Sequence, residues 1–387
     1  MSPALLAGLL FAPLVLADSP LQVTEVHQPE SPAWGTNTVT VTIRNAAASA
    51  RDVMVNYQTR NQAVGKGWGS DANFTIPAGE TRTISVDVTF PAFPGKTSYR
   101  FTVRDAAENS VLWTSNTDHE FPFANRRTAP LKLTAGVQES LRIARREYPA
   151  LRMEQRGRLI IYYLDGDSWI AGRIDAIAAE RARIYQDLVA RINPKFDREI
   201  ALYLFPDADS KLAYTIHRGL GWASGRILAE IFNERDRIDP YHEVCHIIAG
   251  SVGSPPAMLD EGLAAWSQEG HRWDGIAVDS WAKAFAARGA LWPVEKLYGF
   301  PEIGSEATRG PIAYPQSASL VGYLIDRFGW EKFLGAYRVL QRKSDDAAFT
   351  AAFGIDLATL EKDWRQSLAS PDIEPAPQSR VDAELKK

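Results

Sequence analysis

The chain has 387 residues, of which 45% are hydrophobic and 23% are charged, and its formal net charge is −4. This balance is typical of a folded protein with two or three domains. It gives no reason to expect a nucleic acid or an anionic membrane as partner. Because Cys245 is the single cysteine, an internal disulfide is excluded, and packing or a bound metal has to stabilise the fold.

The first 17 residues have the pattern of a secretory signal peptide. An apolar run extends from Leu5 to Leu16, and Val15 and Ala17 supply the small residues that a signal peptidase requires at its cleavage site. This run is too short to span a bilayer, and no later segment is apolar for long enough. The sequence therefore predicts a signal peptide over residues 1–17 and a secreted or periplasmic protein without a transmembrane segment.

Short runs with alternating apolar and polar residues fill residues 18–124. Polar or glycine-containing clusters such as IPAGE and FPAFPGK separate runs such as NTVTVTIRN, RDVMVNYQT, TRTISVDVTF and SYRFTVRD. This spacing is typical of an antiparallel β-sandwich, and no catalytic group of residues stands out within it. Residues 125–156 are interpreted as a linker that includes a helix near residues 137–147.

The pattern changes over residues 157–369. Two buried strands, RLIIYYLD and EIALYLFP, flank a long amphipathic helix over residues 168–192, and GRILAEIFN (225–233) is a third strand. The segments beyond it are helical, so the sequence predicts an α+β domain with a helical C-terminal part. The Pro-rich and charged segment 370–387 is predicted to be a disordered tail.

The segment DPYHEVCH, residues 239–246, carries the strongest functional motif. Asp239 can cap a helix, and Pro240 suits its first turn, where no backbone donor is needed. His242 and His246 are four residues apart, so they lie on one helical face and can bind the same metal ion. Glu243 is rotated by about 100° from His242, which is a position for a general base beside the metal.

A catalytic zinc site requires a third protein ligand and one open position. The candidates after the motif are Asp260, Glu261, Glu269 and His271. A turn over residues 250–256 predicts two antiparallel helices, and counting residues along them brings Glu261 level with His246. The predicted ligands are thus His242, His246 and Glu261, with Asp260 pointing off to the side.

These residues resemble the gluzincin clan of zinc peptidases, in particular the peptidase MA-like family. HEVCH followed by the glutamate of PPAMLDEGLAAW carries the resemblance, and AYPQSASLVGYLIDRFGWEKFLGAY is similar to the family's tyrosine-containing segment and the helix after it. The resemblance implies a zincin-like metallopeptidase domain behind an immunoglobulin-like sandwich. The sequence departs from many gluzincins at Ala264 and Ala265, where an aspartate would orient a ligand histidine.

The expected activity is that of a secreted zinc metallopeptidase with one Zn²⁺ per chain and a peptide or protein substrate. Glu243 is expected to act as the general base for a zinc-activated water. Tyr314, between Pro311 and Pro315 before a predicted helix over residues 316–328, is expected to stabilise the oxyanion, as a tyrosine in a matching place does in similar gluzincins. The strand 225–233 is a candidate for pairing with an extended substrate along the edge of the cleft, and the alternative is an ordinary strand of the sheet. The alternative is a catalytically inactive, zinc-stabilised surface binding protein whose working module is the β-sandwich.

Overall fold

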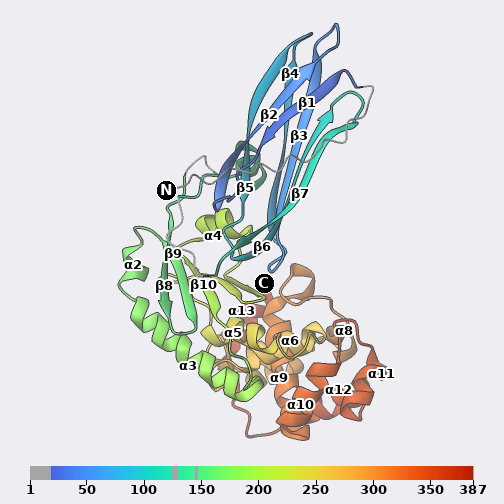
Figure 1. Cartoon of the computed structure of the whole chain (residues 1–387). Coiled ribbons are helices and arrows are strands. Elements are labelled where there is room, and N and C mark those ends of the chain that lie inside the picture. Colours follow the sequence, from blue (N-terminus) through green and yellow to red (C-terminus); the bar gives the residue numbers. More distant parts are fainter. Residues whose placement is uncertain (1–18, 124–129, 144–146, 387) are drawn as a thin grey trace. The chain divides into compact units, whose positions relative to one another are not determined.

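The computed structural model describes residues 19–123, 130–143 and 147–386 (Figure 1). The predicted signal peptide lies outside these residues. Within them, no helix combines the length and the apolar character that a bilayer span needs. The chain divides into two compact units: Met1–Glu154 with Tyr162–Asp167 and Phe205–Arg218, and Gln155–Ile161 with Ser168–Leu204 and Gly219–Lys387.

The first unit contains two antiparallel sheets. A three-stranded sheet has the order β1-β2-β5, with β1 (Leu21–His27), β2 (Gly35–Asn45) and β5 (Thr81–Phe90). A four-stranded sheet has the order β4-β3-β6-β7, with β3 (Arg51–Asn61), β4 (Gly67–Ile76), β6 (Gly95–Asp105) and β7 (Val111–Phe121). An N-terminal β-rich region is thereby confirmed, whereas its immunoglobulin-like topology stays a prediction.

The alternation in the sequence decides which face of each strand is buried. On β2, the side chains of Val39, Val41 and Ile43 are fully buried, while the threonines between them are partly exposed. On β3, Val53 and Tyr57 follow the same two-residue period. The linker region forms α1 (Ala135–Leu141), which ends where Arg142 adopts the left-handed conformation and is shorter than the helix predicted over 137–147. A further helix, α4 (Ala208–Thr215), belongs to this unit.

A five-stranded sheet follows in the order β11-β12-β10-β9-β8. Its strands are β8 (Leu151–Arg156), β9 (Leu159–Leu164), β10 (Ile200–Phe205), β11 (Gly221–Ser224) and β12 (Ile227–Ile231). Every residue of β9, β10 and β12 is buried. This matches the continuous apolar sequences of β9 and β10, whereas β12 contains Glu230, which is buried in an ion pair of 2.7 Å with Arg181. Segment 225–233, the candidate for pairing with an extended substrate, is an ordinary internal strand, because β12 pairs with β10 and β11 and an edge of the sheet is formed by β11 instead.

Helices dominate the rest of the second unit, which confirms a helical C-terminal part. Besides α2 (Ser168–Ala171) and α3 (Ile174–Ile192), they are α5 (Pro240–Ala249), α6 (Ala257–Trp266), α7 (Val278–Ala287), α8 (Val294–Tyr298), α9 (Gly310–Phe328), α10 (Trp330–Val339), α11 (Asp346–Phe353) and α12 (Leu357–Ser367). A short hairpin, β13 (Arg272–Trp273) and β14 (Ile276–Ala277), lies between α6 and α7.

Helices α6 and α9 pack against each other closely enough to require glycine. A Cβ atom on Gly262 would come within 2.6 Å of the carbonyl oxygen of Ser317. Only a residue without a side chain allows this approach, and it fixes α9 beside the helix that carries Glu261.

At the chain's end, where disorder was predicted for 370–387, α13 (Gln378–Lys386) is helical and its Val381 is fully buried.

Candidate metal centre

Helix α5 presents both motif histidines on one face, as the four-residue spacing predicts. The Asp239 side chain accepts a hydrogen bond of 2.9 Å from the backbone N–H of Tyr241, and Pro240 occupies the first turn. The Nε2 atoms of His242 and His246 are 3.3 Å apart. The local sequence therefore builds a rigid helix start immediately before the first histidine.

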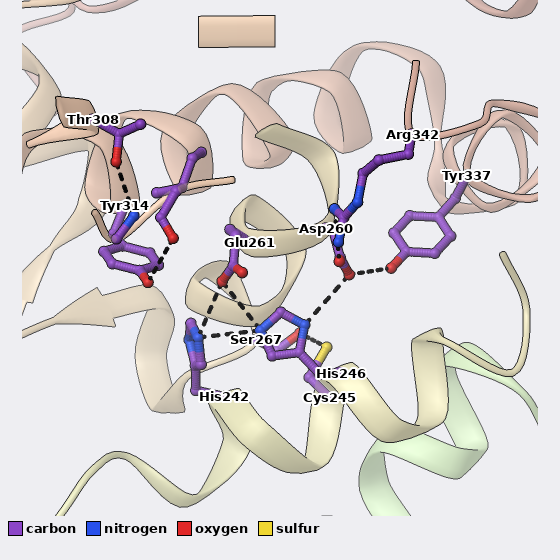
Figure 2. Close-up of polar contacts among 12 residues, drawn as sticks. His242, Cys245, His246, Asp260, Glu261, Ser267, Thr308, Tyr314, Tyr337 and Arg342 are labelled. Carbon is purple, nitrogen blue, oxygen red and sulfur yellow. Dashed lines mark hydrogen bonds and ion pairs between the residues drawn. The ribbon is translucent and has the colours of Figure 1, made fainter. Parts of the chain in front are cut away.

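Glu261 on α6 brings a carboxylate oxygen to the same point. Its Oε2 atom lies 3.1 Å from Nε2 of His246 and 3.4 Å from Nε2 of His242 (Figure 2). Two ligands bound at about 2.0–2.1 Å to a tetrahedral zinc ion lie about 3.3–3.4 Å from each other. The three atoms thus have the mutual spacing of three zinc ligands, and the described part of the chain brings no fourth His, Cys, Asp or Glu into this group.

Electrostatics at these three residues also favours a cation. Burial opposes protonation of His246, but the carboxylates of Glu261 and Asp260 outweigh it and raise the pKa of this imidazole well above its usual value. Burial would raise the pKa of Glu261, yet His246 and His242 lower it below the usual range. A buried site that holds a proton on His246 this strongly in the absence of metal is suited to bind a divalent cation instead of that proton.

Asp260 supports His246 from the side away from Glu261. Its Oδ1 atom lies 3.4 Å from Nδ1 of His246 and accepts a 2.7 Å hydrogen bond from the hydroxyl of Tyr337. Arg342 lies 3.3 Å from the other carboxylate oxygen. Asp260 thus lies to the side of the three ligand atoms, as expected, and is not among them. Its contact with Nδ1 of His246 nevertheless gives it the position of an orienting carboxylate, which Ala264 and Ala265 cannot supply.

His242 is oriented by aromatic rings instead. Within the described residues its buried Nδ1 atom has no hydrogen-bond partner. Its ring packs edge-on against Tyr314, with ring centroids 5.8 Å apart, and against Trp273, with centroids 6.3 Å apart. Tyr314 and Trp273 in turn stack on each other with centroids 4.8 Å apart and an interplanar angle of 17°. The two ligand histidines are therefore held by different kinds of contact.

Glu243 is buried beside the two histidines, with 7% of its surface exposed. Strand β11 passes so close that a Cβ atom on Gly221 would lie 2.6 Å from Oε1 of Glu243. A side chain at this position would meet the ends of the Glu243 and Ile238 side chains, so at least one of them would have to shift. A cleft of about 460 Å³ joins the strand to the metal-binding residues and is lined by residues 221–225, His242, Glu243, His246, Gly250, Gly253, Ser254, Asp260, Glu261, Tyr314 and Arg342.

Tyr314 lines this cleft, and in Figure 2 it and Arg342 lie on opposite sides of Glu261. Helix α9 begins at Gly310, so Tyr314 and Pro315 lie within its first turns rather than before it. The Tyr314 hydroxyl donates a 3.2 Å hydrogen bond to the carbonyl of Ile303. Burial, with Glu261 and Glu243 nearby, raises the pKa of Tyr314, so its hydroxyl stays a proton donor.

Cys245 and His271 stay outside the centre. The Cys245 thiol is fully buried, lies 3.6 Å from the Ser267 hydroxyl, and burial raises its pKa to about 11. His271 is exposed and stacks on Trp266 with ring centroids 4.1 Å apart.

Sequence reasoning missed Trp273 and β11. The turn sequence Asp274–Gly275, which is typical of a tight hairpin, could have indicated the strand that carries Trp273.

Among solved structures, the chain is similar over short stretches to the alkylpurine DNA glycosylase AlkC of Pseudomonas fluorescens bound to DNA, with 15% identity and a TM-score of 0.21 over 27% of this chain and 31% of that one. A β-glucosidase from Listeria innocua matches with 18% identity and a TM-score of 0.20, over 26% of this chain and 16% of that one. The CARDB domain of the PF1109 protein from Pyrococcus furiosus matches with 15% identity and a TM-score of 0.21, over 28% of this chain and 94% of that one. The chain spans less than a third of the first two, and likenesses of this size indicate no function.

A search of curated proteins gives no significant match. Residues 236–370 match the Peptidase MA superfamily. The matched segment contains both histidines, Glu243, Glu261 and Tyr314. This match supports a peptidase MA-like family for residues 236–370.

Proposed function

We propose that the protein is an exported zinc metallopeptidase in which His242, His246 and Glu261 hold one zinc ion per chain. The observation that carries the proposal is the triangle of ligand atoms, 3.1–3.4 Å on each side, with the Glu243 carboxylate buried in the same cleft. Two imidazoles and a carboxylate suit zinc in an open tetrahedral site. Export rests on the sequence of residues 1–17 alone.

Zinc, when bound, supplies a Lewis acid that polarises the scissile carbonyl and makes water acidic. Glu243 accepts the proton of the attacking water and then delivers it to the leaving amine. Its burial against β11 holds the carboxylate in one position and limits competing solvent. The Tyr314 hydroxyl, a donor with a raised pKa, stabilises the negative charge that develops on the carbonyl oxygen.

The substrate is proposed to be an extended peptide or protein segment. Strand β11 is the edge of its sheet, and all four of its residues line the cleft. A peptide that adds to the sheet beside β11 as a further strand would pass alongside the proposed metal-binding residues. This arrangement selects for extended backbone and places few demands on side chains.

The domain boundaries at 18–124, 125–156 and 157–369 also remain proposals.

The alternative, an inactive zinc-stabilised binding protein, is disfavoured by Glu243. A structural zinc site has no use for a buried carboxylate beside an open coordination position, and structural sites are usually closed. The deciding experiment measures metal content together with cleavage of denatured casein by the purified protein. We expect about one zinc per chain, loss of cleavage after chelation, and recovery when zinc is added back. A stoichiometric zinc content without any cleavage would favour the binding protein.

A further inference from the structure

Two residues that flank the Trp273–Tyr314 pair adopt the left-handed backbone conformation without being glycine. Asp274, directly after Trp273, has φ of 50°, and Arg309, five residues before Tyr314, has φ of 45°. At Asp274 the positive φ is the one that an Asp-Gly hairpin turn uses, followed by Gly275 with φ of 77°. Arginine adopts this conformation less readily, so the start of α9 at Arg309 needs stabilising contacts from its surroundings.

Both residues are tied to the same element, helix α13. The Arg380 guanidinium forms an ion pair with the carboxylate of Asp274. On the other side, the Arg309 guanidinium donates a 3.1 Å hydrogen bond to the backbone carbonyl of Leu385. One helix thus bridges the hairpin that carries Trp273 and the turn that leads into Tyr314.

Helix α13 is itself firmly attached. Val381 is fully buried, and Ala376, just before the helix, is 3% exposed. Arg288 at the end of α7 lies 3.0 Å from the carboxylate of Asp382. The helix lies beyond residue 370, where the match to the Peptidase MA superfamily ends. The similarity to this superfamily therefore does not include α13 itself, although the residues that α13 contacts lie within the matched segment.

We propose that α13 is a positioning element. It holds the stacked rings of Trp273 and Tyr314 in place beside the proposed metal-binding residues. Arg380 and Arg309 are its two points of attachment, and they act through the hairpin and the start of α9 rather than on substrate. The ligand helices α5 and α6 do not depend on these two attachments, so the metal site should persist when α13 is detached. The kinetic part of this inference rests on the proposed function, whereas the structural part does not.

The test compares Val381→Asp with Ala383→Asp in the full chain. Both place an aspartate in the same helix, but the first buries it and detaches α13, while Ala383 is exposed and tolerates it. Amide hydrogen exchange should become faster in residues 270–277 and 305–314 of the Val381→Asp variant only, with zinc content unchanged in both. Equal exchange in the two variants would overturn the proposal. Arg380→Ala is a milder variant that should loosen 270–277 alone.

Kinetics supply the second measurement. The turnover number of Val381→Asp should fall by about 10-fold to 10²-fold with little change in KM, because Tyr314 is misplaced. Adding Val381→Asp to Tyr314→Phe should cause no further loss, since the hydroxyl that α13 positions is already absent. A full additional loss in the double variant would contradict action through Tyr314. If the unmodified protein cleaves nothing, the proposed function fails, while the exchange comparison still decides the role of α13.

Discussion

The Nδ1 atom of His246 lies 3.4 Å from a carboxylate oxygen of Asp260, the residue directly before the ligand Glu261. One turn of α6 therefore supplies both a proposed metal ligand and the support for another proposed ligand. Burial opposes ionisation of Asp260, but His246 lowers its pKa, with further help from the Tyr337 hydroxyl. A charged Asp260 favours the tautomer of His246 that carries its proton on Nδ1, which would leave Nε2 available to hold a metal ion.

Replacing Asp260 by alanine should weaken zinc binding by about 10-fold to 100-fold, because His246 loses its orienting partner. Glu261→Ala should weaken it more, since a ligand itself is lost. Competition with a chromophoric chelator measures both affinities. Tyr337→Phe keeps the carboxylate and removes one of its donors, so it should have a smaller effect than Asp260→Ala. An unchanged affinity in Asp260→Ala would show that the contact with His246 is incidental.

Tyr314→Phe should lower the turnover number by about 10²–10³-fold while KM and zinc content change little. The substitution removes only the hydroxyl and leaves the ring that packs on His242 and Trp273. Steady-state kinetics on a peptide substrate provide the measurement. Tyr323→Phe is a suitable control, because the Tyr323 hydroxyl accepts a hydrogen bond from Arg327 and does not line the cleft. If the turnover of Tyr314→Phe equals that of the unmodified protein, Tyr314 only packs.

Gly221→Ala tests the contact between the edge strand and Glu243. The added methyl group would lie 2.6 Å from the Glu243 carboxylate, which has to move aside. We expect a loss in turnover of about 10-fold to 10²-fold with normal zinc content, because a misplaced base transfers protons poorly. Gly335→Ala in α10 is the matched control, since a Cβ atom there meets nothing within 4 Å. Equal activity of Gly221→Ala and Gly335→Ala would contradict the assigned position of Glu243.

Without metal, the Glu261–His246 pair should make stability depend on pH. Although burial opposes both charges, the pKa of Glu261 is lowered, so its contribution is present above its ordinary value of 4.5 and is lost as pH falls through the folded value. The pKa of His246 is raised, so its contribution is complete below 6.5 and is lost as pH rises through the folded value. The pair thus stabilises metal-free protein most between pH 4.5 and 6.5.

Melting temperatures in the presence of a chelator check this pH dependence. Added zinc should reverse the trend above pH 6.5, because it binds the deprotonated imidazoles. The Glu261→Gln variant lacks the negative partner and should lose the maximum between the two pH values. If the melting temperature of metal-free Glu261→Gln depends on pH in the same way as that of the metal-free unmodified protein, the assigned pair is contradicted.

The sequence predicted the parts of the fold that depend on local pattern. Helix α5 was predictable because Asp239 caps it, Pro240 starts it and Gly250 ends it. The strands of the first unit follow their alternation, and the helical C-terminal part follows its periodicity. The convergence of Glu261 with the two histidines was also expected, since it needs only the turn length between two helices.

The missed features depend on contacts between distant segments. Strand β11 has the sequence GWAS, and its glycine is there for the approach to Glu243 and not for any strand pattern. Helix α9 was predicted to start too late because Pro315 lies within it, although its early turns tolerate a residue without a backbone donor. The direction of the Asp260 side chain toward His246 follows from Tyr337 on α10 and from Arg342, which lie about 80 residues away and which no local pattern connects to it.

The central claim is that Glu243 is the general base beside a zinc ion held by His242, His246 and Glu261. The Glu243→Gln variant tests it most directly, because glutamine keeps the shape of the side chain but cannot take up a proton at neutral pH. Zinc content and cleavage of denatured casein are measured on the variant and the unmodified protein side by side. We predict about one zinc per chain in both, with cleavage by the variant reduced by at least about 10²-fold. Cleavage by Glu243→Gln at the rate of the unmodified protein would contradict the account.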